Sequence, residues 1–299
     1  MCCARRTWHD PPVTYQEARY DTIAEGYAAW WSPVHRPGTL ALLDEVDAVV
    51  AAGARRVLDV GCGTGAMAVE AVRRWPGVVV DAVDASAAML EIAGREAAAL
   101  PPAERDRLRY RQSLADELPF DDGTFDLALS AFVLQLVPSR YRALREMRRV
   151  LRPGGRLAYV TWMRGGERFR PDDEYDEARR MVGLEPRWDD DEGGDEGESD
   201  DADPGNDDVP SPDAAVAQLR RAGFGAATAR ASVLVHPFTP EGYLGFLAEF
   251  DDEDEFASLP PDTRAALEQT VLERLHALPP EGLVMRLPIV YASGIRSAR

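Results

Sequence analysis

The 299-residue sequence has little of what several classes of protein require. Its three cysteines are too few for a disulfide framework and are typical of a reducing compartment such as the cytoplasm. Its four histidines show none of the spacings typical of a metal site. No apolar run approaches the ~18 residues of a membrane span, and the N-terminus lacks the apolar stretch of a secretory signal. We therefore expect a soluble, cytoplasmic protein with no metal site and no membrane partner.

Basic residues are also scarce, because 34 Lys and Arg stand against 52 Asp and Glu and give a net charge of −18. Affinity for phosphate backbones comes from cationic side chains, so we expect no nucleic-acid partner. Twelve of the acidic residues lie between Asp189 and Asp208, a run that contains no Lys or Arg. That run has too little apolar surface to order itself and predicts a disordered acidic insertion.

The segment VLDVGCGTG, residues 57–65, is the strongest local pattern. Its first four residues predict a buried strand, and residues 66–75 predict a helix. Glycines at this junction let the backbone approach a ligand and adopt torsions that a Cβ forbids. The following helix directs free N–H groups and the positive end of its dipole to the same point. This indicates a cofactor loop at the carboxyl end of a first parallel strand, although a purely structural turn also favours glycine.

The glycine spacing fits two cofactors. Gly61-x-Gly63-x-x-Ala66 fits a dinucleotide loop, with Asp84 at about the expected distance of ~20 residues. Gly61-x-Gly63-x-Gly65 fits a loop that holds S-adenosylmethionine. Asp59 favours the second, because its carboxylate would repel a pyrophosphate and would suit a ligand with an ammonium and a sulfonium.

Three further segments follow the loop in a fixed order, namely VDAVDASAAML at 80–90, LPFDDGTFDLALS at 118–130 and LRPGGRLAYVTW at 151–162. Together with the loop they resemble the class I S-adenosylmethionine-dependent methyltransferases, and among these the small-molecule branch that includes quinone-pathway methylases. The resemblance covers Val57 to Trp162, and the C-terminal part of the chain matches more loosely.

The resemblance implies S-adenosylmethionine as cofactor and a small-molecule methyl acceptor. The residues it implies as cofactor-binding are Tyr20, Asp59, Gly61, Cys62, Gly63, Gly65, Asp84, Ala85, Met89, Leu114, Ala115 and Ser130. Asp84 suits the ribose hydroxyls, and Met89 suits the adenine. Leu114 departs from the family, since many relatives have there an Asp that accepts from the adenine amino group. A leading helix with Tyr20 and Tyr27 resembles one that crosses the cofactor mouth, although such an aromatic stripe is also typical of a core.

Strands predicted at 78–83, 108–112, 125–130 and 156–162 alternate with helices, and two further strands are predicted at 226–236 and 283–291. This pattern predicts an α/β fold, a Rossmann-like three-layer α/β/α sandwich with a mostly parallel sheet and helical cap additions. Pro33 and Pro37 predict a break between a helix ending at Trp31 and another over 38–52. Helices over 240–250 and 262–278 are expected to cover the carboxyl edge of the sheet.

We divide the chain into four parts. Residues 1–53 form an N-terminal helical cap, and 54–163 form the S-adenosylmethionine-binding core. Residues 164–210 form a linker with the acidic insertion, and 211–299 complete the sheet and add a helical substrate cover.

Methyl transfer from a sulfonium requires mainly alignment and exclusion of water, so no nucleophile–base pair is expected. His35 and His236 are candidate bases for an oxygen or nitrogen acceptor, with packing or surface roles as the alternative. The acceptor atom and the oligomeric state stay open. Two other functions also stay open: an NAD(P)-dependent oxidoreductase, and a non-catalytic adaptor that uses the acidic run.

Overall fold

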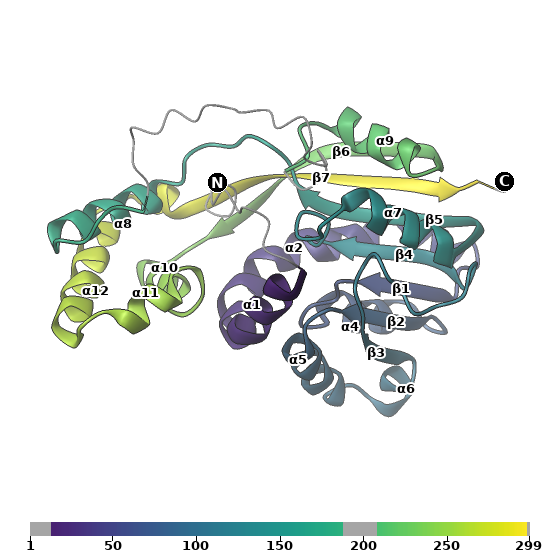
Figure 1. Cartoon of the computed structure of the whole chain (residues 1–299), viewed down its shortest axis with the longest axis horizontal. Coiled ribbons are helices and arrows are strands. Elements are labelled where there is room, and N and C mark those ends of the chain that lie inside the picture. Colours follow the sequence, from purple (N-terminus) through teal and green to yellow (C-terminus); the bar gives the residue numbers. More distant parts are fainter. Residues whose placement is uncertain (1–12, 188–207, 298–299) are drawn as a thin grey trace.

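The computed structural model describes residues 13–187 and 208–297, with side chains from Arg19 onward. A seven-stranded sheet in the order β3-β2-β1-β4-β5-β7-β6 runs through these residues (Figure 1). The strands are β1 (Arg56–Val60), β2 (Val79–Asp84), β3 (Leu108–Gln112), β4 (Phe125–Ala131), β5 (Leu151–Trp162), β6 (Phe224–Pro237) and β7 (Val284–Arg296). The first five pair in parallel, and β7 lies antiparallel between β5 and β6. The prediction of a mostly parallel α/β fold is confirmed.

Helices cover both faces of this sheet and give the predicted three layers (Figure 1). On one face pack α2 (Ser32–Asp44), α3 (Asp47–Ala51), α4 (Ala66–Arg74) and, beside α4, α5 (Ala87–Ala98). On the other pack α7 (Arg140–Val150) and α9 (Pro212–Arg221). The short α6 (Pro102–Arg105) precedes β3. Strand β4 is buried along most of its length, as a central parallel strand should be.

Side-chain caps fix where several helices begin. The hydroxyl of Ser86 accepts from the Met89 N–H at 3.1 Å, and that of Ser139 accepts from the Arg142 N–H at 3.3 Å. Ser211 and Thr239 cap α9 and α10 (Pro240–Phe246) in the same way. Each cap pairs one of the N–H groups that the first helical turn leaves free.

The predicted break at Pro33 and Pro37 is wrong. Helix α2 begins at Ser32, and Pro37 lies inside it. Pro33 occupies the first turn of α2, where proline is tolerated. Beyond it, the buried face of α2, which includes Val34, Leu42 and Leu43, packs on the core and outweighs the hydrogen bond that Pro37 removes. Strand β5 likewise begins at Leu151 rather than Arg156, with a register shift opposite β4.

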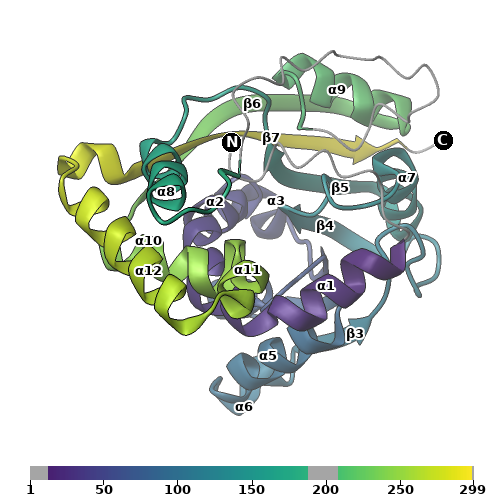
Figure 2. The ribbon, with the colours of Figure 1, turned by 60° about the vertical axis from the view of Figure 1, so that its left-hand side comes forward.

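The N-terminal helix and a C-terminal group of helices meet beyond the carboxyl ends of the strands (Figures 1 and 2). Helix α1 (Val13–Gly26) continues into a π-helical turn, η1 (Tyr27–Trp31). We call the opposing group the cap: α8 (Arg170–Met181), α10 (Pro240–Phe246), a second π-helical turn η2 (Leu247–Asp251), α11 (Glu253–Ser258) and α12 (Pro261–His276). A 3-10 turn, η3 (Pro280–Leu283), leads from it into β7.

Buried polar contacts join α8 to the rest of the cap. The Tyr175 hydroxyl donates to Asp252 at 2.7 Å, and Arg179 donates to Glu255 at 2.5 Å. The Tyr243 hydroxyl also donates to Asp172. Because these groups are paired and, apart from the half-buried Glu255, buried, loss of one partner would leave an uncompensated polar group in the interior. The predicted acidic insertion runs from Asp189 to Asp208, and all of it except Asp208 lies outside the described residues.

Two helical glycines provide a matched test of this packing. A Cβ on Gly26 of α1 would overlap the backbone carbonyl oxygen of Glu249, whereas a Cβ on Gly94 of α5 would meet nothing within 4 Å. We expect Gly26→Ala to destabilise the protein by about 1–3 kcal/mol through overpacking. Gly94→Ala should stabilise it by about 0.5–1 kcal/mol, because alanine loses less backbone entropy in a helix. Thermal melts measure both, and equal melting temperatures for the two variants would contradict the close approach of α1 and η2.

Candidate functional site

The glycine loop between β1 and α4 depends on backbone torsions that side chains disfavour. Gly61, Gly63 and Gly65 have φ values of 72°, 51° and 85°. A Cβ on Gly61 would overlap the Val133 side chain, and one on Gly65 would lie 2.6 Å from the Tyr110 hydroxyl. At Gly63 the nearest atom would be Tyr27 Cε1 at 4.0 Å, so the loop is open on the side that faces η1. The loop therefore has open space at Gly63, whereas Gly61 and Gly65 are packed against neighbouring side chains.

Asp84, at the end of β2, holds this loop in place. Its Oδ2 accepts from the Gly63 N–H at 2.7 Å, and its Oδ1 accepts from the Ser86 N–H at 3.0 Å. The N–H groups of Gly61 and Cys62 donate to the Val83 carbonyl oxygen at 2.8 and 2.9 Å. Burial raises the pKa of Asp84, and its hydrogen bonds oppose that shift. A carboxylate oxygen accepts more than one hydrogen bond, so Asp84 retains acceptor capacity for a ligand hydroxyl.

Asp59 lies near the end of β1, beneath the loop, and is 1% exposed. Burial, with a contribution from the charge of Asp84, raises its pKa to about 8. The Ala68 N–H opposes this shift, yet neither carboxylate oxygen makes a hydrogen bond of ordinary geometry to the described residues. A buried carboxylate of this kind is costly unless a positive charge lies nearby. The site therefore suits a cationic ligand and disfavours an anionic one.

Helix α1 lies across α5 and faces the loop. The rings of Tyr20 and Tyr27 meet edge to face with centroids 6.0 Å apart. Both rings pack around Met89, which is 2% exposed. Asp21 Oδ1 accepts from the Ser86 hydroxyl at 2.6 Å and from the Ala88 N–H at 3.1 Å. Thus Tyr20, Met89 and Asp84 lie close together near the loop, although they come from three separate segments.

The other expected cofactor residues flank the loop. Cys62 is buried, and burial raises the pKa of its thiol well above the usual value. The Ser130 hydroxyl donates to the Val60 carbonyl at 2.9 Å and joins the ends of β4 and β1. The Ala85 carbonyl accepts from Gln112 at 2.8 Å. Leu114 and Ala115 are half-buried in the turn after β3.

The two candidate histidines have different surroundings. His35 is buried, burial lowers its pKa to about 3, and its ring stacks on Phe132 at 4.6 Å. Its Nδ1 is 3.2 Å from the Tyr27 hydroxyl, whereas its Nε2 has no hydrogen-bond partner among the described residues. His236 is half-buried on β6 beside Phe238, and burial lowers its pKa. The structure thus places His35, through Tyr27, next to the loop.

The rings of Trp31, Phe132 and Trp162 lie against His35, and those of Phe246 and Phe250 pack on Trp31. Sequence reasoning did not assign Trp162, Phe246 or Phe250 to the site. Phe132 follows β4 with a φ of 58°, a torsion that is rare for an aromatic residue and marks a local constraint. The four-residue spacing of Phe246 and Phe250 indicates one helix face, but it does not reveal that this face meets Trp31.

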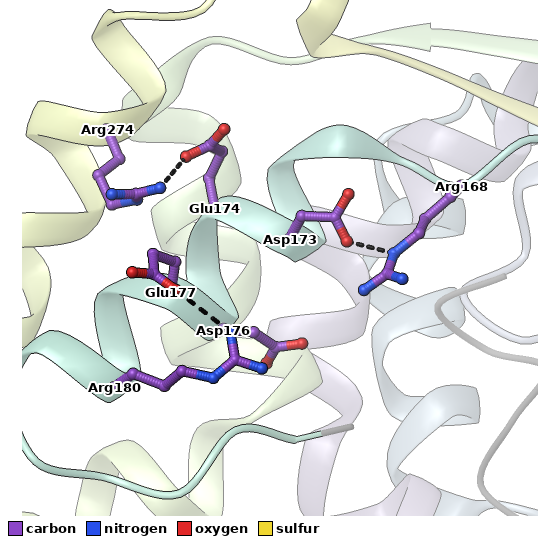
Figure 3. A pocket seen from close by; sticks show the side chains of 7 residues that line it. All are labelled: Arg168, Asp173, Glu174, Asp176, Glu177, Arg180 and Arg274. Carbon is purple, nitrogen blue, oxygen red and sulfur yellow. Dashed lines mark hydrogen bonds and ion pairs between the residues drawn. The ribbon is translucent and has the colours of Figure 1, made fainter. Parts of the chain in front are cut away.

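A separate hollow of about 360 Å³ lies on the surface between α8 and α12 (Figure 3). Seven charged residues line it: Arg168, Asp173, Glu174, Asp176, Glu177, Arg180 and Arg274. Three ion pairs cross its walls, Arg168–Asp173, Arg180–Glu177 and Arg274–Glu174. The hollow has neither glycine-loop nor aromatic residues, so it is distinct from the site at the sheet edge.

Two further features bear on the class of site. Among residues 13–187 and 208–297, no three or more His, Cys, Asp and Glu side chains are grouped to hold a metal ion. Within the same ranges, none of the helices combines the length and apolar composition that crossing a membrane requires.

Comparison with known proteins identifies the type of domain that contains the glycine loop. Residues 58–159 match the family model described as "Methyltransferase domain". The ubiquinone/menaquinone biosynthesis C-methyltransferase UbiE of Idiomarina loihiensis is 45% identical over 114 residues, 36% of this chain and 42% of that protein. A demethylmenaquinone methyltransferase of Symbiobacterium thermophilum is 32% identical over 175 residues, 54% of this chain and 66% of that protein. The chain thus spans roughly half of the length of the curated relatives that it matches.

Solved structures show the same fold at low identity. The YcgJ protein of Bacillus subtilis superposes with a TM-score of 0.53 at 20% identity, covering 88% of this chain and 99% of that one. A phosphoethanolamine N-methyltransferase of Haemonchus contortus, solved with S-adenosylhomocysteine, has a TM-score of 0.50 at 18% identity, covering 93% of this chain and 57% of that one. These matches support the Rossmann-like methyltransferase fold.

The raised pKa of Asp59 predicts how the stability of the folded protein depends on pH. Its folded pKa of about 8 lies above the ordinary value of 3.8, so between these values the folded protein binds a proton that the unfolded chain releases. The stability of the ligand-free protein should fall as pH rises through this window and level off above pH 8. Asp59→Asn should flatten that decline, whereas Asp106→Asn at an exposed position should not. Thermal melts between pH 5 and pH 9 measure this, and parallel curves for wild type and Asp59→Asn would contradict it.

Proposed function

We propose that this chain, whose core is a class I methyltransferase domain, transfers a methyl group from S-adenosylmethionine to a small-molecule acceptor. The observation that carries the proposal is the buried Asp59, to which no described side chain donates a hydrogen bond, beneath a glycine loop that is open at Gly63. The positive charges of a cofactor with an ammonium and a sulfonium would stabilise the ionised form of that carboxylate. The neighbouring Asp84 provides acceptor oxygens for ribose hydroxyls.

In this proposal, different residues bind different parts of the cofactor. The loop from Gly61 to Gly65 takes the amino-acid end of the cofactor, and Asp84 with Ala85 takes the ribose. Met89, Leu114 and Ala115 pack against the adenine, with Tyr20 closing over them. The bound sulfonium supplies an activated methyl group, so the chain's own task is to align the acceptor and exclude water.

The aromatic residues around His35 support an acceptor with an apolar ring. His35 keeps an unpaired Nε2 in that cluster, and its lowered pKa of about 3 keeps the ring neutral at physiological pH. A neutral imidazole nitrogen accepts or donates one hydrogen bond, according to its tautomer. We therefore assign His35, rather than His236, to orient a polar group of the acceptor beside the methyl donor. The acceptor atom stays open among oxygen, nitrogen and carbon.

The two alternative functions find less support. A nicotinamide dinucleotide would bring a pyrophosphate to the loop, and that negative charge would not stabilise the ionised form of Asp59, which burial disfavours. An adaptor would not need the open space at Gly63 or Asp84, and this chain has both. We propose the four-part division given above, with 1–53 and 211–299 contributing the covers, and a cytoplasmic setting because of the cysteine content.

The cofactor assignment predicts a difference between two carboxylates on one strand. Asp84→Ala should weaken S-adenosylmethionine binding about tenfold to a hundredfold, because hydrogen bonds to a charged acceptor contribute roughly 1.5–3 kcal/mol. Asp81→Ala is the matched control, since Asp81 faces the other side of β2 toward Arg56 and should change affinity little. Calorimetry with S-adenosylmethionine and NAD measures this. Tight NAD binding, or equal effects of the two substitutions, would refute the assignment.

The acceptor assignment predicts a difference between two histidines. His35→Phe should leave S-adenosylhomocysteine affinity within about twofold but lower turnover at least about tenfold, within the usual range for a positioned polar group. His236→Phe should leave both unchanged. Turnover is measured as S-adenosylhomocysteine release with acceptors found in a screen of small aromatic and quinone-like compounds. A fully active His35→Phe variant would show that His35 has no role in turnover.

A further inference from the structure

The helix formed by α1 and η1 touches both sides of the proposed site. In both views α1 lies between the cap helices and α5 (Figures 1 and 2). Asp21 and Trp30 are nine residues apart on this helix, which corresponds to about 13 Å of axial rise. Asp21 contacts the cofactor side, whereas Trp30 contacts the cap.

On the cofactor side, hydrogen bonds run continuously from the loop to α1. The Gly63 N–H donates to Asp84 Oδ2, and Asp84 Oδ1 accepts from the Ser86 N–H. The Ser86 hydroxyl then donates to Asp21 Oδ1 at 2.6 Å, and the Ala88 N–H donates to the same oxygen at 3.1 Å. Asp21 therefore fixes the turn that carries Asp84, although no motif of the core includes it.

On the cap side, the two π-helical turns meet at close range. The Trp30 Nε1–H donates to Glu249 Oε2 at 2.6 Å. A Cβ on Gly26 would overlap the Glu249 carbonyl oxygen, and a Cβ on Gly245 would overlap the Trp30 ring. The rings of Tyr27 and Trp31 each lie 5.9 Å from that of Phe250. Gly26 thus permits a near backbone-to-backbone contact and Gly245 leaves room for the Trp30 ring, so the two turns pack directly on each other.

We propose that Asp21 is a positioning residue for Asp84, and that the α1–η1 helix couples occupancy of the cofactor site to the order of the cap at residues 240–258. The proposal rests on the proposed function, since it takes the glycine loop as the cofactor site. Coupling through a rigid helix with contacts at both ends is reciprocal, so the cap contact also affects cofactor affinity. The π-helical turns at the contact fit this role, because such turns are frequent at functional sites.

Hydrogen exchange with and without saturating S-adenosylhomocysteine tests the coupling. In the wild type, the ligand should slow exchange both in residues 19–31 and in residues 240–258. Asp21→Ala should still bind the ligand, about fivefold more weakly, but exchange in 240–258 should no longer respond. Asp21→Asn should restore the response, because its amide oxygen accepts the same two hydrogen bonds.

Glu25→Gln is the matched control, because Glu25 also joins α1 to α5, through Arg95 at 2.5 Å, but has no link to Asp84. It should behave as the wild type. Reciprocity is tested with Glu249→Ala, which should weaken S-adenosylhomocysteine binding about fivefold although it lies on the cap. Asp254→Asn, exposed on α11, should not.

The outcomes separate the two proposals. If S-adenosylhomocysteine does not bind the wild type, the proposed function fails and the coupling fails with it. If the ligand binds but exchange in 240–258 does not change, the coupling alone is refuted. It is also refuted if Asp21→Ala keeps the full response of the cap, or if Glu25→Gln loses it as well.

Discussion

Parallel pairing of β1 with β2 is the constraint on which the rest of the site depends. The register pairs Asp59 with Ala82 and Val60 with Val83, so both strands end at the same edge of the sheet. Two carboxylates, Asp59 and Asp84, are therefore held close together in a region of low polarity, and the charge of Asp84 contributes to the raised pKa of Asp59. The glycine loop covers this pair with backbone N–H groups but satisfies only Asp84. In the proposed function, this buried carboxylate favours a positively charged ligand.

The covering layer is built from the two ends of the described chain. Helix α1 docks on α5 through Asp21, and η1 docks on the cap through Trp30. The aromatic cluster around His35 lies where these contacts and the sheet edge converge. Cofactor and acceptor would thus be enclosed by elements that meet through one helix, and such closure excludes water from the reacting groups.

Much of the core could be predicted from sequence because its signals are local. The buried run at 125–130 and the alternating strands and helices reflect periodicity, and Ser86 and Ser139 act on N–H groups only three residues away. The glycine loop was predictable because its torsions exclude side chains. The environment of the glycine loop was less predictable, because the lack of a side-chain partner for Asp59 depends on burial by distant segments.

The errors and omissions come from tertiary contacts. Pro37 was expected to end a helix, yet the buried face of α2 continues it. The Trp30–Glu249 hydrogen bond joins residues 219 positions apart, and no local pattern predicts such a pair. Phe132 could be placed at a strand end from sequence, but its left-handed torsion and its stacking on His35 could not.

Proton release on cofactor binding tests the central claim most directly. If a cationic cofactor binds above Asp59, the carboxyl with a pKa of about 8 must lose its proton near pH 7. Calorimetry of S-adenosylmethionine binding in buffers of different ionisation enthalpy measures this: about one proton should be released by the wild type and none by Asp59→Asn. Binding without proton release, or equal release by the two proteins, would contradict it.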